Sequence, residues 1–245
     1  MGQIPTWFGS KNCPRSPALL DDPNVSERAN NERSLVIVDG SVPSLLALWS
    51  EGVLAGPVGN GRFAPVAFVT GILGQAGEQL ASPDIVSQRN RLTERCQCGA
   101  VVVDDLLDRG RWGLSDQVGL LLRACAAAVE QGCRRVLWAH CVGIGQIDAG
   151  PVIEEVARCF ERSLLISRVV NIDLPTSKLV RVEMPYIELN FDQLTDLVID
   201  GDVPIDLARW CQFAQEAGGP CERGAHCEIC ARWTEVRKVI GWAAA

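Results

Sequence analysis

The chain has 245 residues, 47% of them hydrophobic, and a formal net charge of -7 at pH 7. This size suits one large domain, and the acidic balance argues against a protein built for direct nucleic-acid binding or for attachment to anionic membranes. Charged residues such as Asp104 and Arg123 interrupt the richest apolar stretches, so none reaches the roughly 18 residues of a membrane helix and no membrane partner is expected.

The first part of the chain differs in character from the rest. Residues 1–33 are rich in Asn, Pro, Ser and charge and show no hydrophobic period, which predicts a flexible or loosely docked N-terminal arm. Strand and helix patterns begin at Ser34. We therefore expect an α/β domain of the nucleotide-binding type over 34–205 and a metal-binding C-terminal segment over 206–245, packed on the same domain.

A buried strand and a helix open the predicted domain. Residues 35–38 are a continuous apolar run that leads directly into the turn 39–41, as expected of a strand buried on both faces. Pro43 stands at the first helical position after this turn, and leucines follow at helical spacing. Gly52 is the expected end of that helix.

Strands and helices then alternate along the chain. The helix over 115–131 has the clearest pattern, with Ser115 and Asp116 as its predicted cap. Alternation of this kind indicates βαβ units, and hence a doubly wound parallel sheet in a Rossmann-like α/β fold. The other predicted strands are 65–70, 99–104, 135–140 and 178–183, and the other predicted helices are 151–162 and 191–199, with an exposed helix or extended loop over 85–96.

In such sheets ligands bind beyond the carboxyl ends of the strands, where the strand order reverses. The turn after the first strand and residues 140–143 are therefore candidates for the mouth of a site. Gly40 and Ser41 precede a helix and are suited to hold a phosphate through backbone N–H groups; the alternative is a tight connection in which Ser41 caps the helix. His140 beside Cys141 suggests a catalytic pair, but neighbours on a strand point to opposite faces.

Four cysteines gather near the C-terminus and have the character of a metal site. Cys227 and Cys230 have the spacing that lets one tight turn aim two sulfurs at one ion, and Cys211 and Cys221 complete a set of four. Four soft, deprotonated ligands predict a structural zinc ion, with His226 as a spare nitrogen. The alternative is that some of these residues are ordinary thiols packed in a core.

The redox environment follows from the cysteines as a group. Eleven cysteines would suit a disulfide-rich secreted protein. The sequence, however, has no basic region followed by an apolar stretch and a cleavage site. A reducing cytoplasm is therefore the expected location.

The C-terminal third carries a series of short motifs in a fixed order. They are Met184-Pro185-Tyr186-Ile187-Glu188, Val203-Pro204, Trp210-Cys211, Pro220-Cys221 and Cys227-Glu228-Ile229-Cys230-Ala231-Arg232. This order resembles the 7-cyano-7-deazaguanine synthase (QueC-like) family of queuosine precursor synthesis, a branch of the adenine nucleotide α-hydrolase superfamily. The resemblance covers about 210 residues from Ser34 onward. It departs from the family in the last loop, which has five residues between Cys221 and Cys227 where the family usually has two.

The resemblance implies a structural zinc on the four C-terminal cysteines and a site for ATP and magnesium. Members of the family adenylate the carboxylate of 7-carboxy-7-deazaguanine and convert it with ammonia to the amide and the nitrile. Their phosphate loop reads Ser-Gly-Gly-x-Asp-Ser. The matching residues 39–44 are Asp-Gly-Ser-Val-Pro-Ser, so Gly40 and Ser44 keep the pattern, whereas Asp39 and Ser41 depart from it.

These departures weaken a phosphate site in three ways. Ser41 puts a Cβ where the backbone must approach a phosphate, and Pro43 removes both a carboxylate for the metal and an N–H donor. Asp39 adds a like charge, which at about 4 Å costs about 1 kcal/mol in water and about 4 kcal/mol at a surface-like dielectric. The sequence therefore predicts a degenerate phosphate loop.

Three functions remain open from the sequence. One is a pseudoenzyme of this lineage that keeps the fold and the zinc and acts as a binding or partner subunit, with a deazapurine, a nucleotide, another protein or a second copy as its partner. Another is an active ATP-dependent carbon–nitrogen ligase that acts on a carboxylated deazapurine. The last is an unrelated, zinc-stabilised α/β binding protein.

Overall fold

The computed structural model describes residues 32–56, 63–70, 91, 94–104, 114–142, 152–208, 210–211, 220–221 and 227–240. All of them belong to one compact unit, Glu32–Ala245. The predicted N-terminal arm lies outside the described residues except for Glu32 and Arg33. Most of the segment 85–96 also lies outside them, although residues 94–96 are helical.

Five parallel strands form a single sheet in the order β3-β2-β1-β4-β5. This order confirms the predicted α/β fold with a doubly wound sheet, and it places the reversal of strand order between β1 and β4. Leu35 of β1 lies opposite Val66 on one side and Val136 on the other. The strands are β1 (Ser34–Val38), β2 (Val66–Val69), β3 (Ala100–Val103), β4 (Arg135–Trp138) and β5 (Arg181–Glu183).

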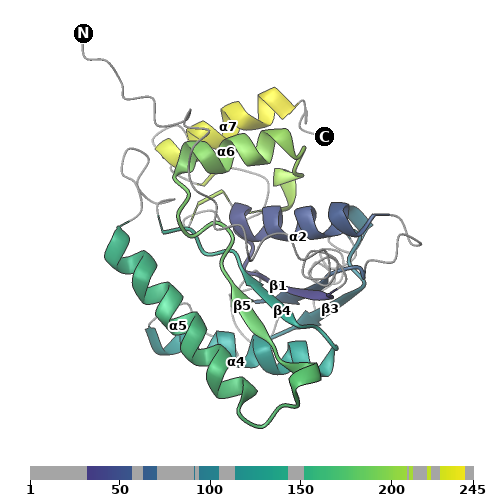
Figure 1. Ribbon diagram of the computed structural model, residues 1–245. Coiled ribbons are helices and arrows are strands. Elements are labelled where there is room, and N and C mark those ends of the chain that lie inside the picture. The colour runs from purple at the N-terminus through teal and green to yellow at the C-terminus, as the bar shows by residue number, and fades with distance from the viewer. Residues whose placement is uncertain are drawn as a thin grey trace, which may run out of the picture. The chain divides into compact units, whose positions relative to one another are not determined.

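Helices cover both faces of the sheet (Figure 1). Val36 and Val38 of β1 face a core shared with α2, α6 and α7, whereas Leu35 and Ile37 face a second core shared with α4 and α5. None of the helices in the described part of the chain is long and apolar enough to cross a membrane. The helices are α2 (Val42–Ala55), α4 (Leu114–Glu130), α5 (Ile153–Asn171), α6 (Phe191–Asp200) and α7 (Glu228–Ile240), with short 3-10 turns at Thr176–Lys178 and Ile205–Leu207.

Gly52 does not end helix α2, contrary to the sequence prediction. The helix continues to Ala55 and is capped by Gly56, whose φ of 66° lies in the left-handed region. A Cβ atom on Gly52 would lie 2.1 Å from the carbonyl oxygen of Cys96. This glycine is therefore a contact residue that lets the backbone before β3 approach the helix.

Two helices extend beyond what the sequence predicts. Helix α5 continues past residue 162 to Asn171, and its second half carries apolar side chains on both the buried and the exposed side, which hides the helical period. Helix α7 was not predicted at all. Its buried side consists of Cys230, Trp233 and Val236 between charged residues, so the apolar pattern is short.

Several element ends also differ from the prediction. Strand β4 ends at Trp138, so His140 lies beyond the hydrogen-bonded ladder, and β5 begins only at Arg181. Helix α4 begins at Leu114, so Ser115 and Asp116 lie in its first turn and not before it. These shifts matter most at His140, which becomes a loop residue at the carboxyl edge of the sheet.

A network of charged side chains ties β4 and β5 to helix α2. The Arg135 guanidinium lies 2.9 Å from Glu183 and 3.2 Å from Glu51, measured between nitrogen and oxygen atoms, and the Ser34 hydroxyl donates to Glu51 at 2.7 Å. Arg181 also pairs with Glu183. Burial by itself would raise the pKa of Glu183, but the hydrogen bonds and charges of Arg135 and Arg181 outweigh it and hold the pKa below its ordinary value.

Candidate functional site

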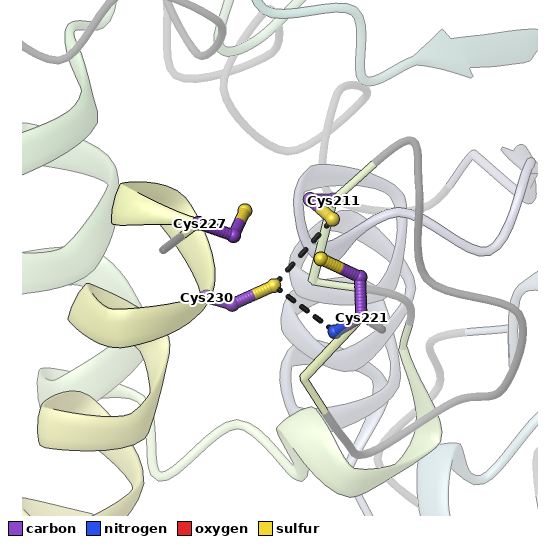
Figure 2. A group of neighbouring side chains, drawn as sticks. All are labelled: Cys211, Cys221, Cys227 and Cys230. Atoms are coloured by element: carbon purple, nitrogen blue, oxygen red, sulfur yellow. Dashed lines mark hydrogen bonds between the residues drawn. The ribbon is translucent and has the colours of Figure 1, made fainter. Parts of the chain in front are cut away.

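The four C-terminal cysteines meet in one cluster (Figure 2). Their Sγ atoms all lie within 4.8 Å of one another. Cys227 and Cys230 come from the start of α7, and Cys211 and Cys221 face them from the segments before that helix. Cys230 is fully buried, and its sulfur lies 3.4 Å from the Cys211 sulfur and 3.4 Å from the backbone nitrogen of Cys221.

The chemistry of this donor set fits a thiophilic metal ion. All four donors are sulfur, which soft and borderline ions prefer over water and carboxylate. The N–H of Cys221 points at the Cys230 sulfur, and the first turn of α7 adds the positive end of a helix dipole; both favour thiolate. Burial raises the pKa of the Cys230 thiol, so without a cation the cluster has to carry protons. The cluster is thus able to hold a metal.

Aromatic contacts hold helix α7 and the Trp210 segment in place. The Trp233 ring packs against Phe191 of α6 with centroids 5.1 Å apart, and the Trp210 indole donates to the carbonyl of Ile205 at 3.0 Å. The Arg237 guanidinium lies 5.8 Å from the centre of the Trp210 ring. Trp210 is therefore a buried packing residue beside the cysteine cluster, and its ring contacts both the Ile205 turn and Arg237 of α7.

The loop over 39–44, which the resemblance predicts to be a phosphate loop, is closed by its own side chains. The Asp39 carboxylate accepts the backbone N–H of Ser41 at 2.9 Å and the Ser41 hydroxyl at 2.6 Å through the same oxygen, Oδ1. The Ser44 hydroxyl donates to the carbonyl of Ser41 at 2.9 Å, and Ser44 is 2% exposed. Gly40 has a φ of 83°, which allows the sharp turn after β1.

The hydrogen bonds of this turn bear on both predictions for Ser41, the phosphate site and the helix cap. The Ser41 N–H, which would point at a phosphate, already has an anionic acceptor within the chain. Ser41 is the N-cap of α2, but its side chain makes no cap hydrogen bond to that helix, because its hydroxyl donates to Asp39. The Asp39 carboxylate is thus the internal acceptor of both Ser41 donors.

His140 lies across the reversal of strand order from this loop. Its ring stacks on Trp138, with centroids 4.9 Å apart and planes at 12°. Burial lowers the pKa of His140, opposed by the charges of Asp39 and Glu155 and reinforced by Arg162. The imidazole is therefore neutral at physiological pH and adds no positive charge beside Asp39.

The structure gives His140 and Cys141 separate partners. The Cys141 thiol is buried and donates to the carbonyl oxygen of Leu189 at 3.2 Å. The His140 ring, by contrast, stacks on the Trp138 ring. Nothing in this arrangement supports a pair that shares a proton.

An ion pair that the sequence analysis did not predict lies at the same edge of the sheet. Asp104 follows β3, and its side chain is 3% exposed. It accepts two hydrogen bonds from Arg123 of α4, at 2.9 and 3.0 Å, and one from the Thr70 hydroxyl at 3.3 Å. The sequence signal that could have indicated this ion pair is a carboxylate directly after an apolar strand. The pair fastens α4 to the carboxyl ends of β2 and β3 and leaves that carboxylate fully engaged.

Other cysteines in the described residues have the properties of core side chains. Burial raises the pKa of Cys96, Cys98 and Cys125 to about 12, so these thiols stay protonated. Each stands in one of the two hydrophobic cores. Gly143, the last residue of the predicted site mouth over 140–143, and His226, the predicted spare ligand, lie outside the described residues.

Comparison with known proteins gives little further guidance. No protein-family model matches the chain, and no curated protein matches it. Among solved structures, it is similar to a U34-tRNA thiolase, NcsA, from Methanococcus maripaludis, solved with its 4Fe–4S cluster. The alignment covers 85% of this chain and 67% of that chain, at 13% sequence identity and a TM-score of 0.45. We therefore base the function of this protein on its own residues.

Proposed function

We propose that this chain is a QueC-like protein with a structural zinc ion that has lost ATP turnover and acts as a binding or partner subunit. The observation that carries the proposal is the hydrogen-bonded turn at Asp39 and Ser41. A carboxylate that accepts the Ser41 N–H competes with phosphate for the donor and also repels it. The motif order of the C-terminal third supports the lineage.

The same loop argues against the ligase alternative. ATP-dependent ligation needs a metal-bound triphosphate held by backbone N–H groups and a carboxylate for the magnesium ion. In this chain Pro43 replaces that carboxylate, and Ser44 turns its hydroxyl to the backbone. The neutral His140 supplies no compensating charge. Within the described loop 39–44, these differences support the loss of ATP turnover.

Calorimetric titration with ATP and magnesium tests the proposal directly. The expected result for the purified, metal-loaded protein is no binding heat, together with no pyrophosphate release when 7-carboxy-7-deazaguanine and ammonia are supplied. A parallel titration with 7-carboxy-7-deazaguanine alone tests whether a deazapurine is still bound. Pyrophosphate release dependent on that substrate would establish the ligase instead.

A single substitution sharpens this test. Asp39→Ser removes the internal acceptor and restores the residue of the family pattern, so ATP binding that is undetectable in the wild type is expected to become detectable, as removal of one nearby like charge predicts. Asp196→Ser, on the exposed side of α6, removes the same charge at a distance and is the matched control. Equal ATP affinity in both variants would contradict the assigned role of Asp39.

We further propose that zinc, and not an iron–sulfur cluster, occupies the four cysteines. Four sulfurs bound tetrahedrally to one zinc ion at about 2.3 Å lie about 3.8 Å apart. The sulfur atoms of this cluster all lie within 4.8 Å of one another, which is compatible with that spacing. In a 4Fe–4S cluster each thiolate binds its own iron, which requires a wider spacing. Metal analysis is expected to find about one zinc per chain, with no iron and no visible absorption; stoichiometric iron with sulfide would contradict it.

A further inference from the structure

The four cysteines of the metal cluster differ in their access to solvent. Cys221, Cys227 and Cys230 are buried, with exposed fractions of 9% or less, whereas Cys211 is half-buried. Exposure and thiolate character together decide which cysteine an oxidant attacks. Cys211 is therefore the ligand that a small oxidant from solvent reaches first.

The Cys211 sulfur also has a second sulfur close by. The Sγ atoms of Cys211 and Cys230 lie 3.4 Å apart, and Figure 2 shows the two side chains pointing toward each other. A disulfide bond is about 2.05 Å long, so a movement of about 1.4 Å closes the pair. One sulfur is open to attack, and the other is in place to react with the product.

We infer that Cys211 reacts with small peroxides and that its oxidation joins it to Cys230 in a disulfide that releases the metal. The inference rests on the zinc ion of the proposed function, because a bound metal keeps both sulfurs deprotonated and thiolate is the nucleophilic form. The substrate class is hydrogen peroxide or a small alkyl hydroperoxide, which is compact enough to reach a half-buried sulfur.

The reaction balances in two steps. The Cys211 thiolate attacks one peroxide oxygen and the O–O bond breaks, which gives a sulfenic acid and a hydroxide or alkoxide that takes up a proton from water. The Cys230 thiolate then attacks the Cys211 sulfur, the S–O bond breaks, and hydroxide leaves as the disulfide forms. Two electrons have passed from the two sulfurs to the peroxide. The metal site has lost two of its four thiolates.

The disulfide differs from simple loss of the metal in what it leaves connected. Cys230 stands in the first turn of α7, and Cys211 stands 19 residues earlier in the chain. The new bond therefore keeps α7 joined to the segment at Cys211 after the metal has gone, whereas a chelator frees all four cysteines. Reduction by a dithiol in the presence of zinc reverses the change. The cluster is in this way a reversible redox switch.

Treatment of the zinc-loaded protein with hydrogen peroxide tests the inference. About one zinc per chain is expected to appear in solution, together with the loss of two of the eleven thiols. Peptide mass spectrometry is expected to find Cys211 joined to Cys230. Dithiothreitol and added zinc should restore both the thiols and the bound metal.

Two variants locate the reactive sulfur. Cys211→His removes the accessible thiol but keeps a zinc ligand, so the release of zinc by peroxide should slow by about tenfold or more. Cys141→Ser is the matched control, because it removes a buried cysteine outside the cluster and its hydroxyl can keep the hydrogen bond to the Leu189 carbonyl. This variant should release zinc at the rate of the wild type.

Zinc retained in peroxide, a disulfide that omits Cys211, or equal rates of zinc release from the two variants would overturn the inference. The disulfide map of the wild type does not depend on how well either variant holds zinc. The zinc content is measured before peroxide is added, so a protein without zinc would count against the proposed metal, and the disulfide map would then decide the reactivity of Cys211 by itself.

Discussion

At the scale of single residues, Gly52 shows how one absent side chain determines a contact between two elements. The carbonyl oxygen of Cys96 occupies the space that a Cβ atom would need. Because the atom in the way belongs to the backbone, it cannot rotate aside as the end of a long side chain would. The residue is thus fixed by packing, although it stands in the interior of a helix where glycine is otherwise unfavourable.

Gly52→Ala is accordingly expected to destabilise the protein by about 1–3 kcal/mol through overpacking, against the small gain in helix propensity. Gly119→Ala in α4 is the comparison, because its Cβ would meet only the Arg123 guanidinium, at 3.1 Å, and not the backbone of another element. That variant should be neutral or stabilised by up to about 1 kcal/mol. Urea denaturation of both variants measures the difference, and a stable Gly52→Ala protein would show that the Cys96 backbone can move.

Asp39 illustrates what the sequence indicates and what it leaves open at a single residue. The sequence places a carboxylate in a loop where the family that the chain resembles has serine, and this predicts repulsion of phosphate. The hydrogen bonds from the Ser41 backbone and hydroxyl to that carboxylate depend on the sharp turn at Gly40, and so they appear only in the structure. The Asp39 carboxylate therefore acts both as a hydrogen-bond acceptor within the loop and as a negative charge that repels phosphate.

At the scale of elements, charged side chains link β4, β5 and α2. Glu183 is the shared acceptor, because Arg135 and Arg181 both donate to it. Its pKa is lower in the folded protein than in the unfolded chain. The unfolded state therefore binds the proton more readily, and the stabilisation by Glu183 is present above the unfolded pKa and is lost as the pH falls through the folded pKa.

The expected result is a stability difference between wild type and Glu183→Gln that is largest above about pH 5 and shrinks as the pH falls below about 4. Urea denaturation across this range measures it. Glu235→Gln, which removes a highly exposed acid paired with Lys238 on α7, is the control and should show almost no such difference. If the free energy of unfolding of Glu183→Gln depended on pH in the same way as that of the wild type, the acid sensitivity would come from other groups.

At the scale of the whole molecule, the fold was more predictable than its contacts. Continuous apolar runs such as residues 35–38 identify buried parallel strands, and their alternation with helices predicts the sheet. The second half of α5 was missed because Leu164 and Ile166 face opposite sides, and α7 because its apolar side is short. The pair between Asp104 and Arg123 joins residues from two elements, and pattern along the chain does not predict such partners.

The cysteine cluster should couple metal binding to the stability of the whole domain. Cys230 and Trp233 belong to the same hydrophobic core as α2 and α6, so a bound metal would hold α7 in addition to its apolar side. Binding at about 1,000 times the dissociation constant contributes about 4 kcal/mol to the free energy of unfolding. For a chain of this size that corresponds to a thermal midpoint higher by about 8–16 °C.

Removal of the metal with a chelator is therefore expected to lower the thermal midpoint by this amount. Hydrogen exchange should accelerate first in α7 and around Cys211 and Cys221, while β1 and β2 stay protected, because only the former are tied to the metal ligands. Cys230→Ser should melt at the lower temperature from the start and respond little to the chelator. A metal-free wild-type protein with an unchanged midpoint and a protected α7 would mean that the apolar side of this helix alone holds the C-terminal segment.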